Sequence, residues 1–416
     1  MRAEVVAIGS ELLLGDGVDT NSAWISARLA EIGVDVHRHT TVGDNVARMA
    51  DVIGGACRRA DAVIVTGGLG PTSDDLTRVA VARVAGVDLE RRHDIAEYLY
   101  EYWARAGREM PESNLVQADL PVGAQALWPV GTAPGFRVDV GDSTVWCVPG
   151  VPREMEAMVG RDVLPALRAL AGSATTVSRV VRTAGMAESS VGEALLPLVR
   201  RLEDAGNPTV AFLASRGETR VRLTAKAPTR DEALALLAPL VTEVVDVLGV
   251  GVAGVDDEGV EWSIARQLTQ LGWTLAVAES VTGGGVGARL VSVPGASAWF
   301  RGGLITYATQ VKTALAGVDA GLLAAKGPVA EETAGALAVG ARSRLEADVG
   351  LAVVGVAGPT TQGDQPVGVV CVAVALPDGS APTASRRLPA HDRTQVQEFA
   401  GSMALDFLRR RLAALA

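Results

Sequence analysis

Strand-like and helix-like patterns alternate at the start of the chain, and this alternation constrains the fold more than any other feature. Residues 4–8, 34–41 and 62–65 are apolar and strand-like, and residues 20–31 and 45–59 carry apolar side chains at helical spacing. A strand–helix–strand–helix–strand succession is typical of a parallel sheet that helices cover on both faces. We therefore predict an α/β fold whose ligands bind at the carboxyl ends of the strands.

The rest of the chain predicts two further parts. Over residues 173–250 the pattern becomes strand, helix, hairpin, helix, with a tight turn at 216–218, which is typical of a small α+β subdomain. The Gly- and Asp-rich stretch 249–259 predicts the main domain boundary. A second α/β pattern follows and ends in a long helix. The expected domains are 1–172 (parallel sheet), 173–250 (small α+β) and 257–416 (C-terminal α/β).

The composition excludes two classes of protein. Of the 416 residues, 48% are hydrophobic and 21% are charged, which supplies enough apolar material for packed cores and argues against disorder. The net charge is −10, and no run of Lys or Arg is longer than 409–411. A nucleic-acid binder normally has a basic face, so we expect no direct binding of nucleic acid.

Cysteine usage and hydropathy predict a cytoplasmic protein. The cysteines are isolated from one another, which argues against a disulfide framework or a zinc site and for a reducing compartment: Cys57, Cys147 and Cys371. The N-terminal sequence lacks the apolar core of a signal peptide. The longest apolar stretch, 233–255, is interrupted by Glu243 and Asp246, so we expect no membrane span and no membrane partner.

A glycine-rich loop with two aspartates follows the third predicted strand. Residues 66–75 read TGGLGPTSDD; the glycines allow the backbone to approach a ligand closely, and a helix start after the loop would offer free N–H groups to an anion. Asp74 and Asp75 would repel a phosphate unless a cation lay between them. The loop therefore predicts a phosphate cradle with a bridging divalent metal. The alternative interpretation is that Ser73 or Asp74 only caps the helix.

A serine at a strand-to-helix turn is the main candidate for chemistry in the C-terminal part. Ser280 lies within AESVTGGG at 278–285, where the turn and its glycines would expose the hydroxyl beside backbone N–H groups. No histidine lies near it in the sequence, but a buried lysine with a lowered pKa can serve as the base. Lys312, which follows a predicted strand at 304–307, is the candidate. The alternative is an ordinary solvated lysine.

The N-terminal motifs resemble those of a known family. In the family's order, they cover most of residues 1–160 and are similar to the molybdopterin-binding-like domain of the CinA family. The motifs are GSELLLG (9–15), DTNS (19–22), VGD (42–44), TGGLGPTSDD (66–75), NLVQA (114–118), GTAPG (131–135) and PGVPREM (149–155).

This resemblance implies metal-dependent cleavage of ADP-ribose to AMP and ribose 5-phosphate. The residues it implies for a divalent metal, Mg²⁺ or similar, and for water are Glu11, Asp44, Asp74 and Asp75. Those it implies for the substrate are Gly67, Gly68 and Gly70 at the pyrophosphate, and Asn114 and Gln117 at the ribose or phosphates. Ser10 stands where the family has threonine, which keeps the hydroxyl. Because molybdopterin-related proteins share the loop, a molybdopterin-like nucleotide is the competing ligand.

The C-terminal motifs resemble the CinA C-terminal domain. They are AESVTGG (278–284), PGAS (294–297), ITY (305–307), Lys312, GVAGP (355–359), PVG (366–368) and DR (392–393). The resemblance implies a nicotinamide mononucleotide amidase that uses a serine–lysine pair and no cofactor. The implied roles are nucleophile for Ser280, base for Lys312, supporting hydroxyl for Tyr307, orientation of the site for Glu279, and substrate binding for Thr282, Gly283 and Arg393.

Several positions depart from the family pattern. Val281 stands where the family usually has cysteine, and Ala330 and Val354 replace residues expected to carry a hydroxyl. Thr360 and Thr361 replace an Asp/Gly-rich continuation. We expect each change to lie at the presumed pocket, where lost hydroxyls weaken the binding of a polar substrate and its transition state.

Three functional hypotheses follow. The leading one is a bifunctional pyridine-nucleotide recycling enzyme whose small-molecule partners are ADP-ribose and nicotinamide mononucleotide. The second keeps the pyrophosphatase, or a molybdopterin-like nucleotide binder, beside a degenerate C-terminal domain. The third is a competence-related interaction protein. The family resemblance also implies a homodimer.

Overall fold

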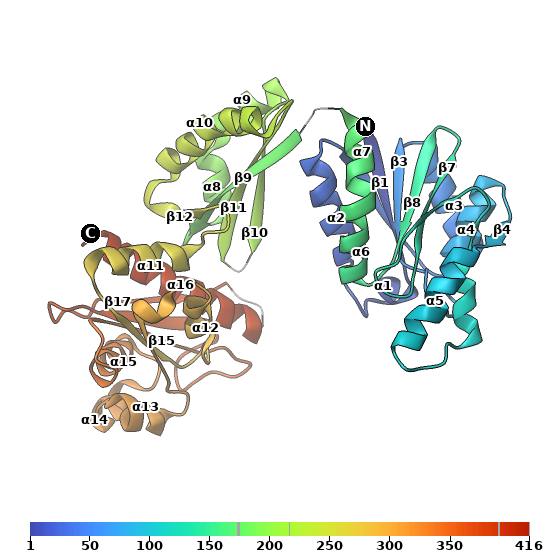
Figure 1. Ribbon diagram of the computed structural model, residues 1–416. Helices are drawn as coiled ribbons and strands as arrows, with labels where there is room; N and C mark the ends of the chain where they lie inside the picture. Colours follow the sequence, from blue (N-terminus) through green and yellow to red (C-terminus); the bar gives the residue numbers. More distant parts are fainter. Residues whose placement is uncertain (173–174, 216, 390–391, 416) are drawn as a thin grey trace. The chain divides into compact units, whose positions relative to one another are not determined.

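The computed structural model describes residues 1–172, 175–215, 217–389 and 392–415. The chain forms two compact units (Figure 1), each with its own sheets and hydrophobic clusters. They are Met1–Val177 with Ala225–Ala235, and Ser178–Thr224 with Leu236–Ala416.

The first unit is built on a six-stranded sheet. Its strands are β1 Arg2–Ile8, β2 Asp35–Val42, β3 Ala62–Thr66, β6 Gln125–Leu127, β7 Gly135–Val140 and β8 Ser143–Val148. They lie in the order β2-β1-β3-β8-β7-β6, in which β2, β1, β3 and β8 are parallel, β7 pairs antiparallel with β8, and β6 pairs antiparallel with β7. The predicted parallel α/β core is therefore confirmed. A separate ribbon pairs β4 Leu89–Arg91 with β5 Asp119–Pro121.

Hydrophobic clusters cover both faces of this sheet. Val6 and Val65 belong to one cluster and Val5 and Ile64 to the other, because successive strand residues point to opposite faces. The first cluster takes in helices α3 Val46–Cys57, α4 Thr77–Ala85 and α5 His93–Arg105. The second takes in α2 Thr20–Glu31, α6 Pro152–Met158 and α7 Leu164–Ala171. Shorter turns complete the unit: α1 Ser10–Leu14, η1 Glu112–Ala118 and the π-helical turn η2 Val159–Val163.

A small four-stranded sheet follows in the chain; most of it belongs to the second unit, but residues 175–177 and 225–235 of its elements belong to the first. Its elements are β9 Thr175–Ala184, α8 Glu188–Ala194, α9 Leu196–Ala205, β10 Thr209–Ser215, β11 Glu218–Ala227, α10 Arg230–Leu248, η3 Gly249–Gly251 and β12 Val252–Val255. The sheet order is β10-β11-β9-β12, and β10 and β11 form the predicted hairpin. The stretch predicted as a boundary, 249–259, contributes β12, which pairs with β9.

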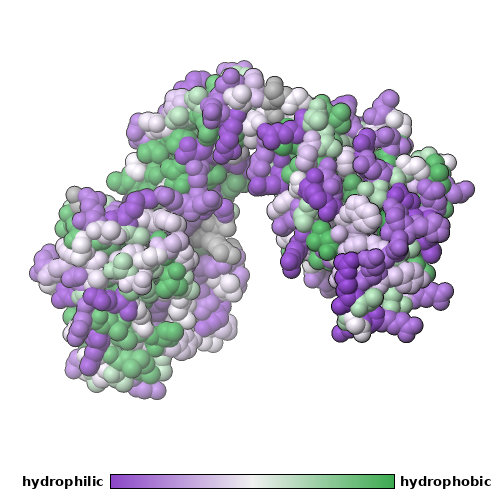
Figure 2. Space-filling model, viewed as in Figure 1, coloured by the Kyte–Doolittle hydropathy of each residue, from purple (hydrophilic) through white to green (hydrophobic). Residues whose placement is uncertain are grey.

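Helix α10 is unusually apolar for an element of a small subdomain. Within the part of the chain that the structure describes, it is the one helix that could cross a membrane by length and composition alone, and 22% of its most apolar 18-residue window is buried. The buried side chains Ala233, Leu237, Val244 and Leu248 are spaced as one helical face. Figure 2 shows hydrophobic surface in this region. The absence of a membrane partner stays a prediction.

The C-terminal sheet has five strands: β13 Leu275–Glu279, β14 Phe300–Ile305, β15 Val349–Gly355, β16 Val369–Ala375 and β17 Thr383–Arg387. Their order is β14-β13-β15-β16-β17; the first three are parallel, β16 pairs antiparallel with β15, and β17 pairs antiparallel with β16. Strand β14 begins and ends earlier than the predicted 304–307, and β17 was not predicted. Because β14, β13 and β15 are parallel neighbours, their carboxyl ends lie side by side.

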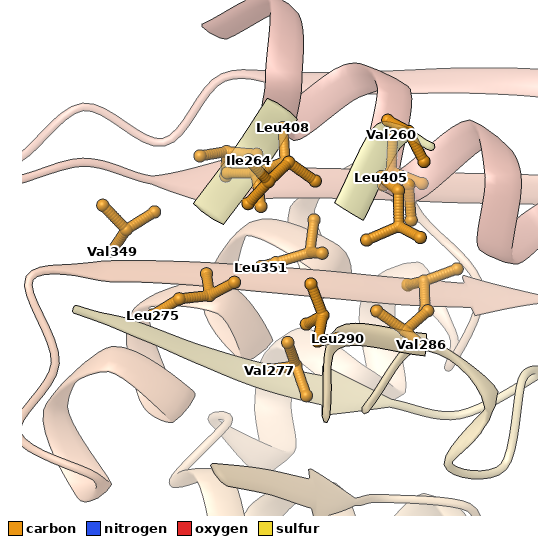
Figure 3. Packing of buried hydrophobic residues seen from close by; sticks show 14 of the residues in the cluster. Val260, Ile264, Leu275, Val277, Val286, Leu290, Val349, Leu351, Leu405 and Leu408 are labelled. Carbon is orange, nitrogen blue, oxygen red and sulfur yellow. The ribbon is translucent and has the colours of Figure 1, made fainter. Parts of the chain in front are cut away.

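Helices cover both faces of this sheet as well. Val277 and Leu351 pack with helices α11 Val260–Leu271, α12 Gly285–Val291 and α16 Arg393–Ala413. Figure 3 shows Ile264 of α11 and Leu408 of α16 meeting Leu351 of β15. The opposite cluster contains Ala278 and side chains of α13 Thr309–Ala316, α14 Ala320–Lys326 and α15 Glu331–Arg344. A short turn, η4 Ala296–Ala298, precedes β14.

Candidate active sites

The loops after four parallel strands meet at one edge of the first sheet. The N–H of Gly9 donates to the carbonyl of Val42 (3.1 Å), and the N–H of Gly67 donates to the carbonyl of Val148 (3.1 Å). Gly67 has φ +103°, and a Cβ there would lie 2.3 Å from the Ile8 carbonyl oxygen, so only glycine fits. The predicted loop is therefore at the carboxyl ends of the strands, where parallel sheets bind ligands.

The glycine-rich loop is held in shape by its own hydrogen bonds. The Asp75 carboxylate accepts from the backbone N–H of Gly70 (2.8 Å) and from both the N–H (2.9 Å) and hydroxyl (2.5 Å) of Thr72. Arg78 is 1% exposed and donates to the carbonyls of Leu69 and Gly70, each at 2.8 Å. The loop is consequently pre-shaped before any ligand arrives.

The alternative that Ser73 or Asp74 caps a helix is wrong. Helix α4 begins only at Thr77, and its N-cap residue, Leu76, makes no side-chain capping bond. The loop does lead into a helix as expected, because α4 begins two residues after Asp75, and the Thr77 hydroxyl donates to the Gly67 carbonyl (2.8 Å). The Thr77 N–H donates to the Gly68 carbonyl (3.2 Å), so this first helical donor is already engaged by the loop.

The four predicted metal ligands do not form a ready-made metal site. Asp44 accepts from the N–H and the hydroxyl of Ser10, each at 2.8 Å, and Asp75 is engaged by the loop. Glu11 and Asp74 are exposed, and hydrogen bonding from the loop lowers the pKa of Asp74. Among the described residues, no group of three or more His, Cys, Asp or Glu side chains could hold a metal ion. Mg²⁺ is often held by one or two carboxylates together with substrate phosphates, so the residues fit only a metal shared with the substrate.

Asn114 and Gln117 lie behind the loop and are not open to solvent. They are 6% and 0% exposed. The Asn114 amide donates to the Gln117 oxygen (3.1 Å), and the Gln117 amide donates to the Leu69 carbonyl (3.4 Å). As they lie, they support the loop from within the core and do not face a ligand in water.

Ser280 and Lys312 come together in the second unit. Ser280 directly follows β13, and its N–H donates to the Val353 carbonyl (3.0 Å), which fixes the backbone at the strand end. Lys312 lies on α13 and is 1% exposed. Its Nζ lies 3.1 Å from the Ser280 Oγ, 2.5 Å from the Thr306 carbonyl oxygen and 3.4 Å from that of Tyr307. The predicted pair is thus within hydrogen-bond distance although 32 residues separate its members.

The surroundings of Lys312 favour its neutral form. Desolvation lowers its pKa from an ordinary 10.5 to about 8, because a charged ammonium is disfavoured away from water. The described residues offer it no carboxylate partner, since its hydrogen bonds go to one hydroxyl and two carbonyls. In the neutral amine the two N–H bonds can point at the carbonyls, which leaves the lone pair directed at the Ser280 hydroxyl. The surface-lysine alternative is therefore wrong.

A cavity of about 220 Å³ opens onto this pair. Arg393 and Tyr307 lie on its wall, where the Arg393 guanidinium donates to the Tyr307 hydroxyl (2.8 Å) and to the Gly358 carbonyl (2.9 Å). Tyr307 is 59% exposed and lies after the end of β14, not within it. The Tyr307 hydroxyl accepts from Arg393 and not from Ser280, so it supports the guanidinium on the cavity wall.

Glu279 holds the loop formed by residues 280–287, which we call the serine loop. It is 2% exposed, and its carboxylate accepts from the Thr282 hydroxyl (2.6 Å) and from three backbone N–H groups. Those donors are Gly284 (2.9 Å), Val286 (3.0 Å) and Gly287 (2.7 Å). Glu279 is absent from the described cavity wall, so it acts on Ser280 by positioning the loop.

Two predicted substrate-binding residues lie elsewhere. Among the described residues that line the Ser280 cavity, neither Thr282 nor Gly283 is present. Thr282 instead lines a second cavity on the other side of the loop. Gly283 has φ +58°, and this left-handed conformation favours glycine for the turn.

The expectation that every departure from the family pattern lies at the pocket is wrong. Val281, Thr360 and Thr361 do line the cavity. Val354 is fully buried in the core on the α15 side of the sheet, and Ala330 is the N-cap residue of α15. Their missing hydroxyls therefore concern core packing and helix capping rather than the substrate.

Sequence reasoning missed three supporting groups. Arg78 holds the N-terminal loop, the Thr306 carbonyl orients Lys312, and Gln397 donates to the Val281 carbonyl (3.0 Å). No local pattern marks any of them. A backbone carbonyl has no sequence signal, and a buried arginine looks like a surface arginine until the fold is known.

Family models match three consecutive parts of the chain. The "Probable molybdopterin binding domain" matches residues 4–169, the "Damage-inducible protein CinA KH domain" matches 178–253, and the "CinA C-terminal domain" matches 257–412.

Relatives match over the full length. A CinA-like protein of Frankia casuarinae is 51% identical over 423 residues, covering 100% of this chain and 97% of the relative. A CinA-like protein of Gloeothece citriformis is 39% identical over 99% of both chains. Among solved structures, CinA from Thermoplasma acidophilum is 32% identical and covers 40% of this chain and 99% of its own, with a TM-score of 0.38. The chain therefore belongs to the CinA family, with a molybdopterin-binding-like N-terminal domain and a CinA C-terminal domain.

Proposed function

We propose that this CinA-family protein is a bifunctional hydrolase of pyridine nucleotides. Its C-terminal site would convert nicotinamide mononucleotide to nicotinate mononucleotide and ammonia. Its N-terminal site would hydrolyse ADP-ribose to AMP and ribose 5-phosphate. The observation that carries the proposal is the 3.1 Å contact between Ser280 Oγ and a buried Lys312 amine whose pKa is lowered to about 8.

The serine–lysine geometry fits amide hydrolysis. The neutral Lys312 amine takes the proton of the Ser280 hydroxyl as Oγ attacks the carboxamide carbon. The C–N bond then breaks, and the leaving nitrogen takes the proton back from Lys312 and departs as ammonia. Water, deprotonated by the same amine, hydrolyses the resulting ester and restores Ser280. No step requires a histidine or a metal.

The cavity wall supports a phosphorylated substrate. Arg393 is fixed by Tyr307 and Gly358, and a guanidinium binds a phosphate through two parallel hydrogen bonds. Thr360 and Thr361 add hydroxyls to the same wall. These groups favour a mononucleotide over an uncharged amide.

For the N-terminal site we propose a pyrophosphate bound by the glycine-rich loop. Asp75 and Arg78 hold the loop backbone, and Asp74 and Glu11 remain exposed beside it. A divalent ion bound together with the substrate would neutralise phosphate charge next to these carboxylates. Addition of EDTA should then abolish AMP formation from ADP-ribose, and excess Mg²⁺ should restore it; AMP formation that persists in EDTA would remove the metal from the proposal.

The test of the amidase is ammonia release from nicotinamide mononucleotide by the full-length protein. Ser280→Ala and Lys312→Ala should each abolish turnover. Lys326→Ala is the matched control, because Lys326 belongs to the neighbouring helix α14 but pairs with Glu332 at the surface (2.6 Å). Turnover by Ser280→Ala at the wild-type rate would overturn the assignment. No turnover in the wild type, with ADP-ribose still cleaved, would favour the degenerate-domain hypothesis.

A further inference from the structure

A second and larger cavity lies in the same unit as the Ser280 site. Its volume is about 630 Å³, within the range of small-molecule sites. Strands β9 and β11 of the small sheet and helices α11, α12 and α16 of the C-terminal part contribute its wall. No step of the proposed hydrolysis uses it.

Hydrogen bonds fix the elements around this cavity. Arg289 of α12 pairs with Glu261 of α11, donates to the Ser402 hydroxyl of α16 (2.9 Å) and pairs with Glu218 of β11 (3.0 Å). Arg409 of α16, 5% exposed, donates to two backbone carbonyls of the segment that leads into β12. These bonds fix the elements around the cavity relative to one another, so the cavity is part of the folded unit and not a gap between loosely packed parts.

The wall carries three arginines and four carboxylates, so an anion would have to be bound by particular arginines rather than by the wall as a whole. Arg289 is neutralised by its two carboxylate partners, but Arg182 and Arg220 form no ion pair among the residues the structure describes. Arg182 donates to the backbone carbonyl of Asp256, and the Arg220 Nε is buried without a hydrogen-bond partner. A buried donor without a partner is costly, and an anionic ligand would satisfy it.

Other wall residues narrow the ligand class. Trp262, half-buried, offers an aromatic ring, and Asp257 offers a carboxylate that can accept from hydroxyl groups. A planar ring, hydroxyls and a phosphate are the parts of a mononucleotide. We infer that this cavity binds a nucleoside monophosphate at a site distinct from the Ser280 cavity.

The serine loop is the wall that the two cavities share. Thr282 lines the second cavity and donates to Glu279, the carboxylate that holds the loop. Gln397 also lines it and donates to the carbonyl of Val281, which lines the Ser280 cavity. A ligand that contacts Thr282 or Gln397 therefore acts directly on the backbone next to Ser280. Occupancy of the second cavity consequently regulates the Ser280 site, and this regulatory part rests on the proposed amidase.

The binding test uses AMP as the probe and calorimetry on the full-length protein. The variant Arg182→Gln/Arg220→Gln should lose one binding event per chain, or bind it about tenfold or more weakly, because charged hydrogen bonds to a phosphate are removed. Arg222→Ala is the matched control, since Arg222 lies on the same strand face, two residues beyond Arg220, and is not on the described cavity wall. Binding by the double variant with wild-type stoichiometry and affinity overturns the site.

The regulatory part is tested without turnover. In Ser280→Ala protein, AMP should slow amide hydrogen exchange at least severalfold in residues 282–287, and the double arginine substitution on that background should remove the effect. Unchanged exchange with AMP bound would reject the coupling. A missing amidase activity would reject the proposed function but leave both of these measurements decisive. Trp262→Leu gives an independent variant of the same wall if the double variant fails to fold.

Discussion

The two candidate sites share a loop conformation but differ in the groups that the loops expose. Each follows a buried parallel strand, β3 or β13, and turns through two glycines with positive φ. In each, one carboxylate accepts hydrogen bonds from the loop's backbone N–H groups and from a threonine hydroxyl: Asp75 in the first and Glu279 in the second. The loops differ in what they present.

The first loop presents charge to water, and the second presents a neutral hydroxyl to a buried amine. Asp74 is exposed and its pKa is lowered, so it stays ionised. Among the residues that the structure describes, buried Lys312 has no carboxylate partner, and its pKa falls to about 8. The comparison teaches that the loop supplies geometry, whereas burial decides whether the site can move a proton near neutral pH.

The largest expected effect comes from removing the buried amine. Lys312→Met should lower kcat/KM for the amidase by about 10³-fold or more, because the base for Ser280 is lost. Below pH 8 the same change should stabilise the fold, since the shift from 10.5 to about 8 corresponds to a penalty on the order of 3 kcal/mol for the charged form. Denaturant unfolding at pH 7 checks this; a less stable Lys312→Met protein would contradict the burial argument.

Removing the carboxylate under the serine loop should come next. Glu279→Gln keeps the shape but loses charge and offers an N–H₂ group to backbone donors, so we expect about a 10²-fold loss in kcat and a loss of about 2 kcal/mol in stability. KM should change little, because Glu279 does not touch the substrate cavity. A change confined to KM would show instead that Glu279 contacts the substrate.

The pH profile separates the two sites. Amidase kcat/KM should rise about 50-fold between pH 6 and pH 8, following deprotonation of the Lys312 amine with a pKa of about 8. Stability should rise with pH from about 8 to 10.5, because the unfolded state binds more protons in that window. The rate of ADP-ribose cleavage, measured on the same protein, should not show this rise between pH 6 and pH 8. The same rise in both activities would contradict the assignment of the pKa to Lys312.

A smaller effect is expected at the N-terminal loop. Asp75→Asn removes a charged acceptor of three hydrogen bonds and should lower ADP-ribose cleavage about tenfold. Asp61→Asn is the control, because Asp61 precedes β3 at the opposite end of the same strand. Equal loss in both variants would point to general destabilisation rather than to the loop.

The smallest effect tests a departure from the family pattern. Ala330→Ser should leave amidase kcat/KM within about twofold, since residue 330 is not on the described wall of the Ser280 cavity. It should stabilise the protein by about 1 kcal/mol, because Ala330 has extended N-cap geometry without a capping side chain. A large gain in activity would show that the missing hydroxyl does belong to the site.

The family resemblance selected Lys312 as the partner of Ser280, whereas the sequence pattern by itself determined most of the order of strands and helices and both glycine loops. These are local features: periodicity reports which side of an element is buried, and glycine reports a tight turn. The same local reading shifted β14 and missed β17, because pairing partners decide such bounds.

Only the tertiary structure decided what the candidate residues do. It placed Lys312 within 3.1 Å of Ser280 while leaving Lys326 at the surface, a distinction that no pattern around either lysine contains. It moved Ala330 and Val354 away from the cavity and turned Asn114 and Gln117 into supports for the loop. Burial, and with it the pKa of an amine, depends on contacts between residues far apart in the chain, and those contacts exist only once the chain has folded.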